Sequence, residues 1–387
     1  MSDDLHVNDP ALRPVADKVR AGEWLSEADG VALYATRDIH SVGRLANFVC
    51  EGLHGDVVYY NRNRHINYTN VCALSCKFCS FYRKRGEEGA YEMNVDEVVA
   101  AAKAADEKGA TEVHIVGGLH PWLKFDYYTT MLSSIRRECP TLQIKAFTAI
   151  EIIHLSRIAR MSVRDVLVAL KEAGLGSLPG GGAEIFDDRV HDEVFKGKVR
   201  EDKWFEVHRT AHSLGLPTTA TMLYGHVETV PERVRHLIKL RELQAESKQA
   251  GGDAHFNCII PLSFAPEKSE LGHLPGPTGL TDLRTLAIAR LMVPNIGTIK
   301  AFWIMQSMHL SQIALRWGCN DLDGTVVWYD ITKREGHGTH QETHVRDIQR
   351  IIREAGRTPV ERDTVYRPVR RDPVTDKIIG VTPVLQR

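Results

Sequence analysis

Short apolar runs alternate with amphipathic segments over most of this 387-residue chain. Apolar and β-branched residues concentrate in eight runs that we expect to be strands, at residues 64–69, 111–116, 143–148, 174–178, 218–223, 255–260, 298–303 and 325–328. Helical periodicity fills the intervals, at residues 95–107, 127–137, 163–173, 203–213, 231–249, 283–291 and 311–317. Strands that alternate with helices form right-handed βαβ units and a parallel sheet. The pattern therefore predicts an α/β protein with a closed (β/α)8 barrel of the TIM type.

The two ends of the chain have patterns that predict additions to the barrel. Three N-terminal helices are expected at residues 11–21, 27–36 and 41–51, and Ser26 with Asp29 forms a capping box for the second. Residues 345–355 have the period of an amphipathic helix that ends at Gly356. We expect the charged segment 367–377 to be a solvated extension. The expected division is a helical cap (1–60), the barrel (61–330), and a C-terminal helix and tail packed on the barrel (331–387).

The composition indicates an ordinary enzyme. With 43% hydrophobic residues, 26% charged residues and a net charge of -1, the chain has enough apolar residues for a large core. It has no charge excess that would favour nucleic acid or an anionic membrane. No apolar run approaches the ~20 residues of a membrane span, and the start MSDDLHVNDP lacks the basic and apolar regions of an export signal. We expect a cytoplasmic protein with no nucleic-acid partner and no membrane span.

Three cysteines give the strongest chemical signal. Cys72, Cys76 and Cys79 have the spacing C-x-x-x-C-x-x-C and directly follow the first expected strand of the barrel. Three thiolates hold three irons of a four-iron, four-sulfur cubane and leave the fourth iron open to a small molecule. Loops that follow barrel strands meet at the face where active sites form. Spacing and fold therefore both favour a reactive cluster.

Other uses of these cysteines fit the sequence less well. Zinc sites usually pair two C-x-x-C knuckles or add histidines, and no second knuckle exists among the other cysteines, Cys50, Cys139, Cys258 and Cys319. Cys258 and Cys319 are interpreted as packing residues. An odd total of seven cysteines without an export signal is typical of reduced thiols. A ferredoxin-type electron carrier normally supplies four cysteines. Zinc and plain electron transfer stay open as alternatives, and a second cluster is not indicated.

Glycine-rich loops follow three of the expected strands, with the sequences GGLHP (117–121), PGGGAE (179–184) and YGHVET (224–229). Glycine lets the backbone approach a ligand closely, although at a strand end it is also common in turns. Three such loops at one rim favour a ligand site.

The cysteine motif with Phe78 before its last cysteine, followed by Gly117 and Gly118 after the second strand, resembles the radical S-adenosylmethionine (SAM) superfamily. Four segments resemble one subgroup of this superfamily, which acts in futalosine-dependent menaquinone synthesis and has relatives that make a deazaflavin cofactor. These segments are NYTNVCALSCKFCSFYR, IVGGLHPW, LPGGGAEIF and TTATMLYGHVET. Within this subgroup, the segments GGLHP, IIPLSF and KAFWIM together most resemble the aminofutalosine synthases. The similarity covers residues 61–368, nearly all of the chain outside the cap.

The resemblance implies a radical SAM barrel with a [4Fe-4S] cluster on Cys72, Cys76 and Cys79, and with SAM as a co-substrate on the open iron. It implies that the 5'-deoxyadenosyl radical adds to the vinyl ether of 3-[(1-carboxyvinyl)oxy]benzoate. Rearrangement and loss of bicarbonate then give 6-amino-6-deoxyfutalosine, while methionine is released. An external one-electron donor such as flavodoxin or ferredoxin is expected.

Two alternative functions remain open at this point. A cyclic dehypoxanthine futalosine synthase has the same fold and cluster, but its radical abstracts hydrogen and does not enter the product. An iron-sulfur electron carrier, from a different class of protein, is inert toward SAM. GGLHP and KAFWIM favour the aminofutalosine synthases over the first alternative, and the missing fourth cysteine argues against the second.

The resemblance also implies roles for the residues that would hold SAM. Phe78 is expected to lie against the adenine, whose flat apolar face suits an aromatic ring. Gly117 and Gly118 are expected to receive the SAM amino group, although Leu119 replaces the acidic residue common at the third position. Glu184 is expected to bond the ribose hydroxyls, with an ion pair to Arg189 as the competing interpretation.

Candidates for substrate binding lie near the expected rims of the barrel. The proposed acceptor has two carboxylates, which favour cationic or N–H partners, and the candidates are His120, His226, Lys300 and Gln306. Because histidine titrates near neutrality, His120 or His226 is also a candidate to relay protons or assist loss of the carboxyl group. A lone histidine is more often structural.

Overall fold

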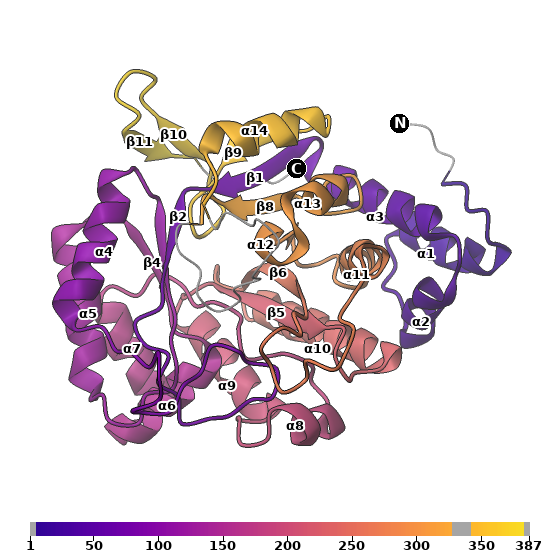
Figure 1. Ribbon diagram of the computed structural model, residues 1–387. Helices are drawn as coiled ribbons and strands as arrows, with labels where there is room; N and C mark the ends of the chain where they lie inside the picture. The colour runs from indigo at the N-terminus through magenta and orange to yellow at the C-terminus, as the bar shows by residue number, and fades with distance from the viewer. Residues whose placement is uncertain (1–4, 327–341, 383–387) are drawn as a thin grey trace.

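The computed structural model describes residues 5–326 and 342–382. Six of its parallel strands form two groups of three (Figure 1), namely β2 (Asn63–Ile66), β3 (Glu112–Ile115) and β4 (Gln143–Ala146), then β5 (Thr218–Tyr224), β6 (Phe256–Ser263) and β7 (Thr298–Ile299). Single parallel bridges at Ser177 and Leu178 join β4 to β5. A bridge from Lys300 to Asp321 joins β7 to β8 (Asp321–Gly324). The strands therefore follow one another around a barrel in chain order.

One broken strand closes the ring. β1 (Val57–Asn61) pairs in parallel with β8, and after Arg62 the chain continues as β2, which pairs with β3. The side chain of Thr325, just beyond β8, holds this joint because it accepts from the Asn63 N–H at 3.1 Å and donates to the Asn63 carbonyl at 3.0 Å. The fold is a (β/α)8-type barrel, as the sequence pattern predicts.

Helices cover the outside of the barrel. They are α4 (Val95–Glu107), α5 (Phe125–Glu138), α6 (Ala149–Ala159), α7 (Val163–Ala173), α8 (Asp188–Val194), α9 (Glu201–Ser213), α10 (Val230–Gln249), α11 (Gly279–Met292), α12 (Trp303–Gln306) and α13 (Met308–Ala314). α7 is typical of them, since Ser162 caps its first turn and Val166, Leu167 and Leu170 are fully buried on one side. Such one-sided burial anchors α7 to the strands.

A helical cap precedes the barrel, as expected. It consists of a short 3-10 turn at Pro10–Leu12 and of α1 (Arg13–Ala21), α2 (Glu27–Ala35) and α3 (Ile39–His54). The predicted capping box is present, because Ser26 Oγ accepts from the Asp29 N–H and the Asp29 carboxylate accepts from the Ser26 N–H. α3 lies along α11 (Figure 1), which fixes the cap to the barrel wall.

The C-terminal segment is more structured than expected. After α14 (Val345–Glu354), β9 (Thr358–Glu361) adds to β1, and β10 (Val369–Arg371) with β11 (Ile378–Val381) forms an antiparallel hairpin beside it (Figure 1). Residues 373–377 are exposed, as predicted for a solvated segment, but residues 367–377 belong to this hairpin and are not a free extension. The reason is ionic, since Arg371 pairs with Glu361 at 2.7 Å and Asp376 pairs with Arg62.

Some strand predictions are corrected by the structure. The run 174–178 forms only single bridges, and the run 298–303 forms a strand over its first two residues before α12 begins at Trp303. The last barrel strand is Asp321–Gly324 and not 325–328, of which residues 327 and 328 lie outside the described part. β1 was not predicted, and it places a barrel strand before the boundary expected at residue 60.

The barrel interior contains charged side chains arranged in pairs. Lys145 lies 3.2 Å from Glu112, Lys300 lies 2.6 Å from Asp323, and the guanidinium of Arg362 donates to Asp321 at 2.8 Å. All six side chains are buried, and a buried charge is tolerated when a partner and hydrogen bonds compensate it. Among the helices of the described ranges, none has the length and apolar character required to cross a bilayer.

Candidate active site at the cysteine loop

The three cysteines lie on the loop that follows β2. The loop folds back on itself, since the Arg83 N–H donates to the Asn70 carbonyl at 2.9 Å and the Cys72 N–H donates to the Arg83 carbonyl at 3.1 Å. The ammonium of Lys84 donates to the carbonyls of Cys72 and Leu74 at 3.0 and 2.9 Å. These bonds fix the backbone around the motif.

The loop forms one wall of a cavity of about 180 Å³. The cavity contains every residue that the sequence predicts to hold the cluster and SAM, namely Cys72, Cys76, Cys79, Phe78, Gly117, Gly118 and Glu184. The other walls include Thr148, Ile150, Glu151 and Lys198. Segments that follow β2, β3, β4 and the bridged residues Ser177 and Leu178 therefore meet at one place.

The thiols fit an iron-sulfur cluster better than a single metal ion. Within residues 5–326 and 342–382, no three His, Cys, Asp or Glu side chains are close enough to hold one ion, as a zinc site requires. The three thiols instead line the same cavity, and a cubane binds each thiolate on a different iron. The Leu119 N–H donates to Cys72 Sγ at 3.4 Å, and such bonds to sulfur are usual around clusters. Burial raises the pKa of the Cys76 thiol to about 12, so only a metal would keep it as a thiolate there.

Packing accounts for the glycine pair. A Cβ on Gly117 would lie 2.8 Å from the ring of Tyr68, and one on Gly118 would overlap the carbonyl of Val71. The loop after β3 therefore touches the cysteine loop backbone to backbone, as only glycine allows. The Gly118 N–H donates to the Thr69 carbonyl at 2.9 Å, which leaves the pair at the cavity wall.

Glu184 forms an ion pair inside the cavity, but with Lys198 and not with Arg189. Arg189 is directed to Glu232 at 2.7 Å and to Glu193 at 3.0 Å. Glu184 has a φ of 38°, a value unusual for a residue with a side chain, and its carbonyl accepts from the Leu223 N–H at 3.0 Å. Strained backbone of this kind is often found at ligand sites.

Phe78 lies at the same wall. Its ring meets Phe195 edge to face at 6.3 Å between centroids, and the Lys198 ammonium lies 5.0 Å from its centroid. One side of the ring thus packs on the protein and the residue still lines the cavity. The predicted contact with adenine remains a prediction.

The two candidate histidines are outside this cavity and are held as structural residues. His120 Nδ1 accepts from the N–H groups of Trp122 and Leu123 at 3.3 and 3.1 Å, and its Nε2 lies 2.6 Å from Glu92. His226 donates through Nε2 to the Leu223 carbonyl at 3.1 Å, and its side chain is fully buried. Burial lowers the pKa of His226, which favours its neutral form.

The other two substrate candidates are buried as well. Lys300 follows β7 and pairs with Asp323 inside the barrel, while Gln306 on α12 donates to the Tyr224 hydroxyl at 3.3 Å and the Pro261 carbonyl at 3.2 Å. Neither lines the cysteine cavity. The remaining cysteines, Cys50, Cys139, Cys258 and Cys319, are buried and free, in agreement with a packing role.

Sequence reasoning missed two charged residues of the cavity, Lys198 and Glu151. Lys198 lies on a loop without any distinctive motif. A sequence pattern could have indicated Glu151, because Thr148 and Glu151 have the T-x-x-E spacing of a capping box directly after β4. The structure contains this capping box at the start of α6.

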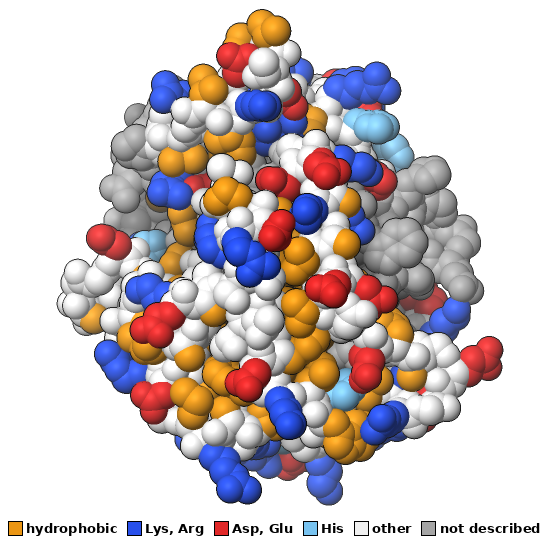
Figure 2. All heavy atoms as spheres, turned by 90° about the vertical axis from the view of Figure 1, so that its left-hand side faces the viewer, with side chains coloured by type: hydrophobic (Ala, Val, Ile, Leu, Met, Phe, Trp, Pro, Cys, Tyr) orange, Lys and Arg blue, Asp and Glu red, His pale blue; other side chains and the backbone are white. Residues whose placement is uncertain are grey.

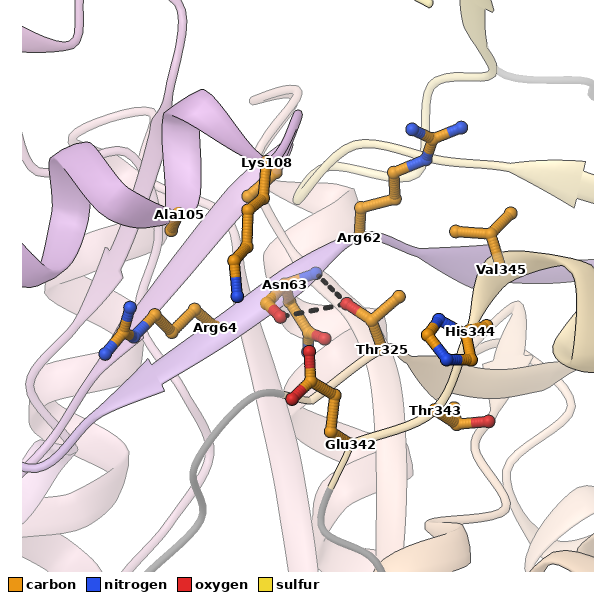
Figure 3. Close-up of a pocket in the computed structure, with 11 residues that line it drawn as sticks. Arg62, Asn63, Arg64, Ala105, Lys108, Thr325, Glu342, Thr343, His344 and Val345 are labelled. Carbon is orange, nitrogen blue, oxygen red and sulfur yellow. Dashed lines mark hydrogen bonds between the residues drawn. The ribbon is translucent and has the colours of Figure 1, made fainter.

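A second pocket, of about 330 Å³, lies outside the barrel wall (Figure 3). Arg64 and Lys108 border it beside α4, and Glu342 and His344 border it on the other side. It contains none of the predicted site residues. The surface on the same flank intersperses acidic and basic side chains (Figure 2), so this face has no single-signed patch.

Comparison with known proteins agrees with the geometry. Residues 66–240 match the radical SAM superfamily, and residues 254–375 match the CofH/MqnC C-terminal region. The chain is 47% identical to an aminodeoxyfutalosine synthase of Thermus thermophilus over 94% of this chain and 97% of the relative. It is 42% identical to an aminodeoxyfutalosine synthase of Streptomyces coelicolor, over 92% of this chain and 94% of the relative.

A second group of relatives has another name. A 5-amino-6-(D-ribitylamino)uracil–L-tyrosine 4-hydroxyphenyl transferase of Methanopyrus kandleri is 38% identical over 93% of this chain and 100% of the relative. Among solved structures, methylornithine synthase superposes with a TM-score of 0.68 at 18% identity, covering 89% of this chain and 97% of the other. The hydrogenase maturase HydG of Carboxydothermus hydrogenoformans superposes with a TM-score of 0.70 at 16% identity, covering 92% and 80%. These two likenesses concern the fold.

The chain belongs to the radical SAM superfamily and, within it, to the aminodeoxyfutalosine synthase family. Radical SAM enzymes use a [4Fe-4S] cluster and SAM, and the cysteine cavity has the donors that such a cluster requires.

Proposed function

We propose that this protein is an aminodeoxyfutalosine synthase of menaquinone biosynthesis. It joins the 5'-deoxyadenosyl group of SAM to 3-[(1-carboxyvinyl)oxy]benzoate, and rearrangement with loss of bicarbonate gives 6-amino-6-deoxyfutalosine and methionine. The observation that supports this most is the single cavity shared by three cysteines, a glycine pair and Glu184. Identity of 47% to a relative of that name supports the choice of substrate.

The residues of the cavity have separate roles in holding the cluster and SAM. Bound at Cys72, Cys76 and Cys79, the cluster supplies the electron that cleaves SAM. Gly117 and Gly118 present backbone groups to the amino acid end of SAM, and Phe78 offers a flat apolar contact to its adenine. Glu184 accepts from the ribose hydroxyls in this proposal, and Lys198 holds its carboxylate in position through their ion pair.

Substrate recognition is proposed for the barrel interior. Of the four candidates, Lys300 is the one with a cationic group inside the barrel, where Asp323 now neutralises it. A substrate carboxylate that approached Lys300 would compete with Asp323 for the ammonium. His120 Nδ1, His226 Nε2 and the amide nitrogen of Gln306 are bonded to the protein, so we propose that these residues shape the site and do not contact substrate.

The partners follow from the chemistry. The substrate is a small molecule, and the cluster requires an external one-electron donor, for which flavodoxin or ferredoxin is suited. We propose a cytoplasmic location, since this chemistry requires reducing conditions.

The assay that tests the function uses anaerobically reconstituted, reduced protein with SAM and the vinyl ether. One methionine for each adenine-containing adduct is expected, with little free 5'-deoxyadenosine. Free 5'-deoxyadenosine in place of the adduct would favour hydrogen abstraction, as in cyclic dehypoxanthine futalosine synthase. Turnover of tyrosine with 5-amino-6-(D-ribitylamino)uracil would favour the second group of relatives. Protein inert toward SAM would favour an electron carrier.

A further inference from the structure

Glu151 is a buried carboxylate in the cysteine cavity that has no cationic partner. Its side chain lines the cavity, and the residue is 3% exposed. Its hydrogen-bond partners are all uncharged, and among the described residues no lysine or arginine pairs with it. The buried carboxylates of Glu112, Glu184, Asp321 and Asp323 each have a lysine or an arginine beside them. Glu151 therefore differs from these four carboxylates in having no cationic partner.

Four donors hold the Glu151 carboxylate in place. Oε1 accepts from the Tyr68 hydroxyl at 3.0 Å and from the Gly117 N–H at 3.1 Å, and Oε2 accepts from the N–H and hydroxyl of Thr148 at 2.7 and 2.8 Å. A carboxylate has about four lone-pair sites. The group is thus fixed and fully bonded, and what it still lacks is a positive charge.

The glycine-pair loop itself supplies no acidic side chain to the cavity, since its third residue is Leu119. Glu151 reaches this loop from α6 through the Gly117 N–H and brings a carboxylate to it. SAM carries two cationic groups, an ammonium and a sulfonium. A preorganised anion in a site that excludes water attracts such a cation much more strongly than it would in solution.

We propose that Glu151 is a SAM-binding residue whose fixed, unpaired negative charge attracts a cationic group of SAM in the cysteine cavity. The inference rests on the proposed use of SAM and assigns a residue to its binding. The charge acts at short range without a new hydrogen bond, because the four donors already occupy the carboxylate. Burial raises the pKa of Glu151 to about 7, so the carboxyl is partly protonated near neutral pH, and a cationic group of SAM beside it would favour the charged form.

Two substitutions separate charge from shape. E151Q removes the charge and keeps an amide that suits a capping box. E151D keeps the charge, and aspartate already serves in the same position of the α2 capping box, at Asp29. E97Q is the matched control, since Glu97 is the equivalent residue of the α4 capping box and is exposed.

The measurement is equilibrium dialysis of SAM against reconstituted protein with an oxidised cluster, with iron and sulfide content as the check on loading. E151Q is expected to raise the Kd for SAM about tenfold at unchanged iron content, E151D less than threefold, and E97Q not at all. A parallel titration with S-adenosylhomocysteine, which lacks the sulfonium charge, assigns the cation: an equal loss indicates the ammonium, and a loss for SAM alone indicates the sulfonium.

Two results would overturn the inference. One is a Kd within twofold of wild type in loaded E151Q, which would leave Glu151 as a helix cap only. The other is a tenfold higher Kd for SAM in loaded E151D, which would show that the hydrogen bonds of Glu151 and not its charge determine the affinity. The E151D result tests the inference even if E151Q does not fold. Wild-type protein that fails to bind SAM would instead refute the proposed function.

Discussion

Lys198 and Glu184 form a buried ion pair in the wall of the cavity that holds the three cysteines. The two side chains are 10% and 8% exposed, and Lys198 also lies over the ring of Phe78. The pair therefore joins the residue proposed for the ribose to the residue proposed for the adenine.

Removing one member of this pair should destabilise the protein. K198M leaves the carboxylate of Glu184 buried and uncompensated, a change that typically costs about 3 to 5 kcal/mol. The free energy of unfolding, measured by chemical denaturation, should recover in the double variant K198M/E184Q. Equal stability of K198M and wild type would show that water or a rearranged partner compensates Glu184.

Each cysteine of the motif should be essential for the cluster. C72S, C76S and C79S are expected to contain little iron and sulfide after reconstitution, because no other thiol of the described residues lines the cavity. C50A is the control, since Cys50 is buried in α3, away from the motif. Iron analysis and absorbance near the cluster bands measure the outcome, and a loaded C76S protein would contradict the assignment.

Substitution of the two histidines should affect folding more than chemistry. H120Q and H226Q each lose a bonded, buried ring, and we expect a lower melting temperature. The ratio of product formed to SAM cleaved should stay at the wild-type value in the folded fraction. A fall in that ratio would support the predicted role of that histidine in proton relay or in loss of the carboxyl group.

Buried neutral histidines should make the protein sensitive to acid. Burial lowers the pKa of His236 to about 3, and its ring is fixed between the Phe186 N–H and the Thr221 carbonyl. In the unfolded chain the histidine binds a proton below its ordinary pKa of about 6.5, whereas in the folded chain it stays neutral. The contribution of neutral His236 to the free energy of unfolding is therefore complete above pH 6.5.

Stability is therefore lost as the pH falls from 6.5 toward 3, by about 1.4 kcal/mol for each pH unit and histidine. Denaturation at several pH values between 7 and 5 should give a steeper decline for wild type than for H236Q. Parallel declines would indicate that His236 is already protonated in the folded protein.

The sequence predicted the site residues that lie close together in one segment, and it missed the contacts between residues far apart in the chain. Cys72, Cys76 and Cys79 lie within one loop, so their spacing alone indicated a cluster. The bond between Gly117 and Glu151 joins residues 34 positions apart, and only the packing of α6 against the β3 loop brings them together. Lys198 meets Glu184 because the chain returns after α8, which no local pattern indicates.

The strands missed or shifted have a similar cause. β1 is short and directly precedes β2, so its apolar residues were attributed to the cap, and its role in closing the barrel depends on β8 far along the chain. The hairpin of β10 and β11 depends on the ion pairs of Arg371 with Glu361 and of Asp376 with Arg62, which is far away in the chain, while its charged composition alone is typical of a solvated tail.

The central claim is that the adenosyl group of SAM enters the product. Its most direct test is mass spectrometry of the reaction with SAM labelled with ¹³C in the adenosine, using reduced, reconstituted protein and 3-[(1-carboxyvinyl)oxy]benzoate. We expect one product that carries all of the labelled carbons together with the benzoate ring. Recovery of the label only as free 5'-deoxyadenosine, with the vinyl ether unchanged, would contradict the account.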